Sequence, residues 1–228
     1  MKKLKDHYSH FFKEFQIDNE TGVLKEFQNL KFMTMPYIGS KYFNTDFKIL
    51  FVGMDVGKDE KPGSFHDFED RRKSIETDNG FNPHIAGTYG TALYFLKAKL
   101  NWEKTWDRMT TFSTFHHATK NILHSENENP LSHIALTNLH KFVTVARELR
   151  AGDENRKFLD VELEEKLFLA EIDVLEPNVI IFQGKLPSSS TLQKIKSTFP
   201  EIYLFPHPSN RKKNGRNPNI YVSTSIKL

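Results

Sequence analysis

Cysteine is absent from the 228 residues of this chain. A structural disulfide, a thiol nucleophile and a cysteine-ligated iron–sulfur cluster are therefore excluded. The sequence also lacks any apolar run near the roughly 20 residues that span a bilayer. Its first residues, MKKLKDHYSHFFKEF, are charged throughout and do not resemble a signal peptide. We expect a cytoplasmic protein with no membrane partner.

The chain has 32 basic and 29 acidic residues, so neither sign of charge is much in excess. A net charge of +3 does not by itself indicate a partner. The distribution is more informative, because the stretch SNRKKNGRNPN (209–219) contains no acidic residue. This stretch is either a solvated basic loop or a loop that contacts phosphates. Its candidate DNA-binding residues are Ser209, Asn210, Arg211, Lys212, Lys213 and Arg216.

Short apolar runs alternate with helical patterns along the rest of the chain. Buried strands are predicted at 47–54, 132–139, 178–184 and 201–209, and helices at 87–100, 160–177 and 188–199. This alternation indicates an α/β fold, a single domain whose central, mainly parallel four-stranded sheet is flanked by helices.

The chain shows no internal repeat and no linker that would divide it. We expect residues 1–46 to be a helical lead-in packed on the core, with a helical pattern that covers 1–32 and is broken at DNETG (18–22). Residues 47–228 are expected to form the α/β domain. It would carry insertions near 58–80, predicted as a long loop, and near 101–131.

Three predicted strands end in residues capable of chemistry, namely Asp55, Asn138 and His207. Each alone has an ordinary explanation: a helix cap, a turn residue and a surface histidine. Parallel sheets, however, bind ligands beyond the carboxyl ends of their strands. Because the three residues occupy equivalent strand ends, we expect them to form one site.

The stretch KILFVGMDVGKDEKPGS (48–64) does not match a phosphate-binding loop. Only three residues separate Gly53 from Gly57, and Asp59 stands where a P-loop needs a serine or threonine for magnesium. Metal ligation is also not expected. The histidines between positions 116 and 140 lack the HExxH or a similar ligand spacing, and we expect no metal and no cofactor.

Several motifs resemble those of the uracil-DNA glycosylase superfamily. The stretch ILFVGMDVG is similar to its first motif and HPSNR to its second. ALTNLHKF is similar to the strand that ends in the base-reading asparagine. DVLEPNVIIFQGK and GTYGTALYFL resemble the helix–strand–glycine unit and the glycine-rich helix entry of the superfamily. The likeness covers about residues 47–225, with Val56 where the family usually has proline.

The resemblance implies the three-layer fold of that superfamily and a monomeric, monofunctional DNA glycosylase. Such an enzyme hydrolyses the N-glycosidic bond of a flipped-out uracil or of a 5-substituted or modified pyrimidine in DNA. Its biological role would be base excision repair or defence against modified phage DNA.

Carried over by motif, Asp55 would orient or deprotonate the attacking water and stabilise the sugar cation, and His207 would donate a hydrogen bond to the departing base. Asn138 would read the base edge, which its amide can do for uracil or, turned over, for cytosine. Further base-binding residues are expected from the first motif and from the 81–89 segment, where a ring would stack on the base. They are Gly53, Met54, Gly57, Phe81 and Tyr89, with His84 as another stacking candidate.

Gly57 predicts the shape of the base pocket. The uracil-specific members carry a tyrosine at this motif position, which blocks the methyl group of thymine. A glycine predicts instead a pocket that accepts substituents at base position 5. The alternative is that the 58–80 insertion, with Phe65, His66 and Phe68, fills the space.

Two other functions remain open from the sequence. The chain could be a catalytically silent relative that binds nucleic acid, or a nucleoside or nucleotide hydrolase on the same fold.

Overall fold

The computed structural model describes residues 1–26, 30–54, 64–76, 82–122, 129–144, 161–199, 201–208 and 217–228. Its helices are α1 (Lys2–Glu14), α2 (Phe68–Glu76), α3 (Pro83–Leu100), α4 (Glu103–Thr110), α5 (Phe115–Ile122), α6 (Val161–Leu175), α7 (Ser189–Thr198) and α8 (Pro218–Ser223). Its strands are β1 (Leu30–Phe32), β2 (Tyr37–Ile38), β3 (Ile49–Gly53), β4 (Ile134–Asn138), β5 (Phe142–Thr144), β6 (Val179–Gln183), β7 (Ile202–Phe205) and β8 (Ile226–Lys227).

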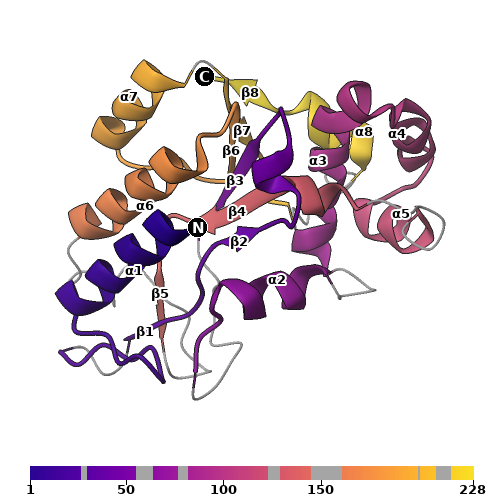
Figure 1. The fold of residues 1–228 in the computed structure, drawn as a ribbon. Coiled ribbons are helices and arrows are strands. Elements are labelled where there is room, and N and C mark those ends of the chain that lie inside the picture. The colour runs from indigo at the N-terminus through magenta and orange to yellow at the C-terminus, as the bar shows by residue number, and fades with distance from the viewer. Residues whose placement is uncertain are drawn as a thin grey trace.

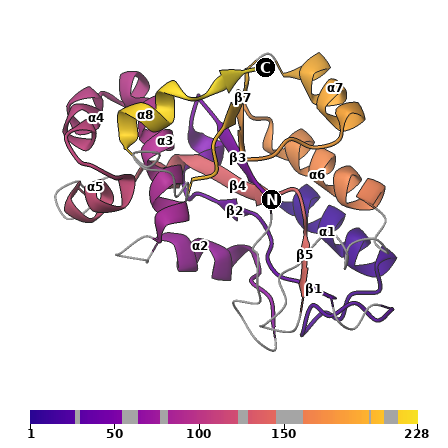
Figure 2. The same cartoon turned by 180° about the vertical axis from the view of Figure 1, so that it is seen from behind.

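The architecture is α/β, with helices on both faces of a central sheet (Figure 1). Helices α1, α6 and α7 cover one face, and α3, α4, α5 and α8 cover the other; Figure 2 shows the same division from behind. The strand pair β1–β5 forms a separate small sheet.

The central sheet has six strands in the order β2-β4-β3-β6-β7-β8. All four predicted strands are present and form its parallel centre, β4-β3-β6-β7. The prediction of a four-stranded sheet was wrong, because short antiparallel strands are added at both edges: β2 pairs with β4, and β8 pairs with β7. The sheet is therefore mixed rather than purely parallel.

Both faces of the central strands are buried, which explains their continuous apolar runs. In β3, Leu50 and Val52 pack toward α1 and α6, whereas Ile49 and Phe51 pack toward α3. The sheet therefore divides the core into two clusters, and polar residues are confined to the strand ends.

The N-terminal segment is less helical than the sequence pattern predicted. Helix α1 ends at Glu14, and Gln16 follows with a positive φ of 49°. The side chain of Asp18 then accepts hydrogen bonds from the backbone N–H groups of Glu20 and Thr21 and stabilises a turn. The described residues that follow do not extend the helix, since they include strand β1 of the small sheet and strand β2 at the edge of the central sheet.

The insertion at 58–80 is not only a loop, because it contains α2. The Asp67 carboxylate accepts from the backbone N–H groups of Glu69 and Asp70 and caps this helix. The region 101–131 supplies α4 and α5, which pack against α3. Within the residue ranges given above, no helix combines the length and apolar composition needed to cross a bilayer.

Candidate functional site

A cavity of about 170 Å³ lies at the carboxyl ends of the parallel strands. Its walls include residues that end or follow β3, β4, β6 and β7: Gly53, Met54, Asn138, Gln183, His207 and Pro208. Helices α2 and α3 complete it. Because Gly53 pairs in register with Asn138, and Gln183 pairs with Phe205, these strand ends lie at the same level of the sheet.

Gly53 makes room for the amide of Asn138. A β-carbon at position 53 would lie only 2.6 Å from Oδ1 of Asn138, so no larger residue fits without displacing that side chain. The two strand ends are also tied together after the sheet. Leu139 N–H donates to the Gly53 carbonyl and His140 N–H donates to the Met54 carbonyl, both at 2.9 Å.

The position of His207 is fixed by close packing at two glycines, Gly184 against His207 and Gly87 against Pro208. Gly184 leaves β6 with a positive φ of 97°, and its N–H donates to the Phe205 carbonyl at 2.8 Å. Gly87 in α3 lies so close to Pro208 that a β-carbon there would be 2.6 Å from the proline Cβ. Tyr221 donates its hydroxyl to the Pro206 carbonyl at 2.5 Å, and burial raises the pKa of this phenol. The His-Pro turn is therefore fixed from three elements.

A second imidazole, His84, lies beside His207 at the cavity wall. The two ring centroids are 4.9 Å apart and the rings are nearly perpendicular, at 89°. His84 stands in the first turn of α3, where the side chain of Asn82 caps the helix by accepting from the N–H groups of His84 and Ile85.

Gln183 and Thr88 form an oriented hydrogen-bond pair in the cavity wall. The Thr88 hydroxyl donates to the His84 carbonyl at 3.1 Å, so its oxygen serves as the acceptor for Gln183 Nε2 at 3.0 Å. With its NH₂ group directed to Thr88, Gln183 has its carbonyl oxygen available for a ligand N–H.

A buried charged network lies behind Asn138. Lys141 Nζ donates to both carboxylate oxygens of Glu171, at 2.8 and 2.9 Å, and to Thr137 Oγ1 at 2.9 Å. Thr137 and Tyr8 also donate to Glu171, and burial, followed by the Glu171 charge, raises the pKa of Tyr8. The Lys141 N–H donates to Glu164 at 2.6 Å. The turn after β4 is thus attached to α6 and, through Tyr8, to α1.

Several predicted site residues lie outside the described part of the chain. They are Asp55, Gly57, Phe81, Ser209, Asn210, Arg211, Lys212, Lys213 and Arg216. The roles given to them stay predictions. Of the predicted residues that are described, the structure brings together Gly53, Met54, Asn138 and His207, with His84 beside them.

Tyr89 is not among the residues that line this cavity. It is fully buried in the core cluster between the sheet and α3, so a stacking role for it has no structural support. Phe65 and Phe68 also lie elsewhere, in the aromatic cluster near α1. The 58–80 region does border the cavity, but through Arg71, Ser74 and Ile75.

Sequence reasoning missed Gln183, Thr88 and the α2 residues. Gln183 could have been found, because it is the polar end of the apolar run NVIIFQ, the same signal that indicated Asn138. Thr88 carries no comparable signal, since a threonine inside a helix pattern is ordinary.

Two imidazoles, those of His84 and His207, lie in the wall of this small cavity. Its carboxamides and hydroxyls come from Asn82, Asn138, Gln183, Ser74 and Thr88. Pockets for drug-sized molecules measure about 300–1,000 Å³, so a cavity of about 170 Å³ suits a single heterocyclic ring. Among the described residues, no three acidic or histidine side chains cluster so as to hold a metal ion. No protein-family model matches the sequence, and the comparison with curated proteins finds no significant match.

Proposed function

We propose that this protein is a DNA glycosylase that hydrolyses the N-glycosidic bond of a flipped-out uracil or of a 5-substituted or modified pyrimidine. The observation that carries the proposal is the convergence of Asn138 and His207 on one ring-sized cavity at the carboxyl ends of the parallel strands. Asn138 and His207 both belong to motifs that resemble those of the uracil-DNA glycosylase superfamily.

The polar groups of the cavity suit a pyrimidine edge. A pyrimidine presents carbonyl acceptors beside an N–H or amino donor, and Asn138 offers both kinds of group. Gln183 adds a carbonyl oxygen whose orientation is set by Thr88. A site whose buried polar groups match a substrate discriminates strongly against bases that leave those groups unpaired.

The chemistry requires stabilisation of charge on both sides of the breaking bond. As the C1′–N1 bond breaks, its electron pair leaves with the base and positive charge develops on the sugar. His207 would donate a hydrogen bond to the base oxygen that gains negative charge, which is worth about 10²–10³ in rate for donors of this kind. Asp55 is proposed, from its motif position alone, to orient the water that adds to C1′ and to stabilise the sugar cation.

The proposal is tested by incubating the protein with oligonucleotides that contain uracil, 5-hydroxymethyluracil or a modified cytosine. Released base is quantified by mass spectrometry. We expect release of at least one of these bases, and release from the 5-substituted substrates would support the open pocket predicted from Gly57. The variant His207→Ala should lower the rate about 10²–10³-fold. The matched control, His117→Ala, alters an exposed histidine on α5 and should release base like the wild type.

The same assay separates the alternatives. Binding of DNA without release of any base would favour the silent binding relative. Release of base from nucleosides, but not from DNA, would favour the small-molecule hydrolase. Either outcome would reject the glycosylase.

A further inference from the structure

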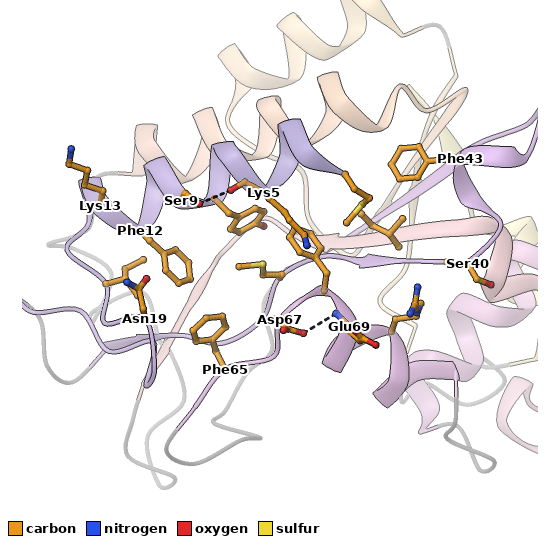
Figure 3. A pocket seen from close by; sticks show the side chains of 18 of the residues that line it. Lys5, Ser9, Phe12, Lys13, Asn19, Ser40, Phe43, Phe65, Asp67 and Glu69 are labelled. Carbon is orange, nitrogen blue, oxygen red and sulfur yellow. Dashed lines mark hydrogen bonds between the residues drawn. The ribbon is translucent and has the colours of Figure 1, made fainter.

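A second and larger cavity, of about 900 Å³, lies between α1 and α2 and is completed by residues 35–43 (Figure 3). Helix α2 separates it from the candidate site. Phe68 and Arg72 line the large cavity, whereas Arg71, Ser74 and Ile75 line the smaller one. None of the roles proposed above uses this space.

Aromatic rings form much of its wall. Phe12 and Phe65 meet edge to face with centroids 5.2 Å apart, and Tyr8 and Phe68 do so at 5.6 Å. Edge-to-face packing of this kind holds the rings in fixed positions. Phe43 lies at the margin with 41% of its surface exposed, one of few large apolar side chains so exposed. Exposed aromatic rings beside a cavity are typical stacking partners for planar ligands.

Charged groups of both signs surround the cavity, three basic and two acidic. Lys5, Lys13 and Arg72 line it, and among the described residues none of the three forms an ion pair. In Figure 3 the Lys5 side chain extends over the middle of the cavity, while Lys13 points away from it. Of the two acidic residues there, Asp67 is already engaged as the cap of α2. Cations close to aromatic faces are the combination that binds nucleotides.

We propose that this cavity binds a nucleotide, with its base against the aromatic wall and Phe43 and its phosphate at Lys5 and Arg72. The nucleotide is either free or part of a DNA strand whose neighbouring base occupies the candidate site. Binding of a nucleotide within a DNA strand rests on the proposed function, whereas binding of a free nucleotide does not. Helix α2 is about 10–12 Å across with its side chains. Successive phosphates of a DNA strand lie about 3.4 Å or more apart, so a few nucleotides can span that distance.

The experiment measures binding of dAMP, of deoxyadenosine and of a short oligothymidine to the full chain. The cavity variants are Phe43→Ala and Lys5→Gln. Their matched controls are Ile220→Ala, a residue equally exposed on α8, and Lys2→Gln, an exposed α1 residue that does not line the cavity. We expect each cavity variant, but neither control, to weaken nucleotide binding at least about fivefold. Lys5→Gln should also reduce the slope of log K against log salt for oligothymidine by about 0.7.

The probes distinguish the two sources. Displacement of dAMP by oligothymidine, or binding of oligothymidine alone, indicates a strand-borne nucleotide. Binding of dAMP that oligothymidine does not displace indicates a free one. The proposal is overturned if neither probe binds, or if the cavity variants bind both probes like their controls.

Base release is measured in parallel so that the two proposals can fail separately. A protein that releases no base from DNA but loses nucleotide binding in the cavity variants would reject the glycosylase and retain this site. Normal base release with unchanged nucleotide binding in those variants would reject this site alone.

Discussion

Gly53 is the residue on which the geometry of the candidate site depends most directly. The variant Gly53→Ala would place a β-carbon 2.6 Å from Oδ1 of Asn138, which must then move. The atom displaced is the end of a side chain, so we expect the free energy of unfolding to change by less than about 1 kcal/mol. Base release should fall about a hundredfold, because a shift of about 1 Å in a positioning group has that effect.

Urea unfolding and the rate of base release measure these two effects on the same preparation. The control is Gly90→Ala, since a β-carbon there would collide with the Phe115 ring in the core, away from the cavity. Gly90→Ala should lower the free energy of unfolding to the extent that this collision disturbs the core. Unchanged base release by Gly53→Ala would contradict the role given to Asn138.

Single residues show what the sequence could and could not predict about the site. Asn138 and His207 were predictable because parallel strands bring their carboxyl ends together. A stacking role for Tyr89 has no structural support, since a helix covering a sheet buries one face completely, and Tyr89 lies on that face. Gly57 and Asp55 lie outside the described residues, so their roles stay predictions.

At the scale of elements, α6 and the turn after β4 are joined by the buried pair Lys141–Glu171. The variant Lys141→Met would leave the Glu171 carboxylate buried without its cation. This should lower the free energy of unfolding by about 3–5 kcal/mol. The double variant Lys141→Met/Glu171→Gln removes both charges; the amide oxygen can still accept from Tyr8, and the amide NH₂ group can donate to the Thr137 hydroxyl, which has lost its donor Lys141. It should therefore recover most of that loss.

Chemical denaturation of the wild type and of the single and double variants measures this coupling. An exposed pair supplies the control: Lys227→Gln breaks the contact between Lys227 and Glu201 and should leave the denaturation midpoint close to that of the wild type. A double variant no more stable than Lys141→Met would show that the charge pair is not what joins α6 to the turn after β4.

Element boundaries were less predictable than element types. The predicted helices at 87–100, 160–177 and 188–199 correspond to α3, α6 and α7, and Ser188 caps α7 by accepting from the Thr191 N–H. The helical pattern was expected to cover residues 1–32 with a break at DNETG (18–22), but helix α1 ends at Glu14. Beyond it, Phe15 packs from a turn and Phe32 from strand β1, and apolar residues in such segments can imitate a helical period.

Low pH should lower the stability of the whole protein, partly through Glu165. Burial alone would raise the pKa of this carboxyl, but hydrogen bonds from Thr191 and from Ser188 outweigh it and lower the pKa below 4.5. A lowered acid pKa contributes stability above the ordinary value and loses it as the pH falls through the lowered one. The wild type should therefore exceed Glu165→Gln in stability at pH 7, and the difference should shrink below pH 4.5.

Urea midpoints of both proteins between neutral pH and pH 3 measure this difference. Glu162→Gln, on the same helix, is the control for a general loss of charge. A gap between wild type and Glu165→Gln that stays constant or widens in acid would contradict the assigned hydrogen bonds.

At the scale of the whole molecule, the sequence predicted the α/β fold class and the parallel centre of the sheet. Four strands buried on both faces give continuous apolar runs that are easy to recognise. The edge strands β2 and β8 are two residues long each and carry no such run, so the six-stranded mixed sheet could not be predicted. The cavity between α1 and α2 also escaped prediction, because it is built from segments brought together only by the fold.

The central claim is that four strand ends form one cavity that binds a single base. The most direct measurement is a nuclear magnetic resonance titration of the labelled protein with free uracil, the simplest of the pyrimidine products that the proposed function allows. We predict saturable shifts of the side-chain amides of Asn138 and Gln183 and of the His207 ring, with one common dissociation constant. The exposed ring of His117 should not shift. Absence of shifts at the three cavity residues, or different dissociation constants for them, would contradict the account.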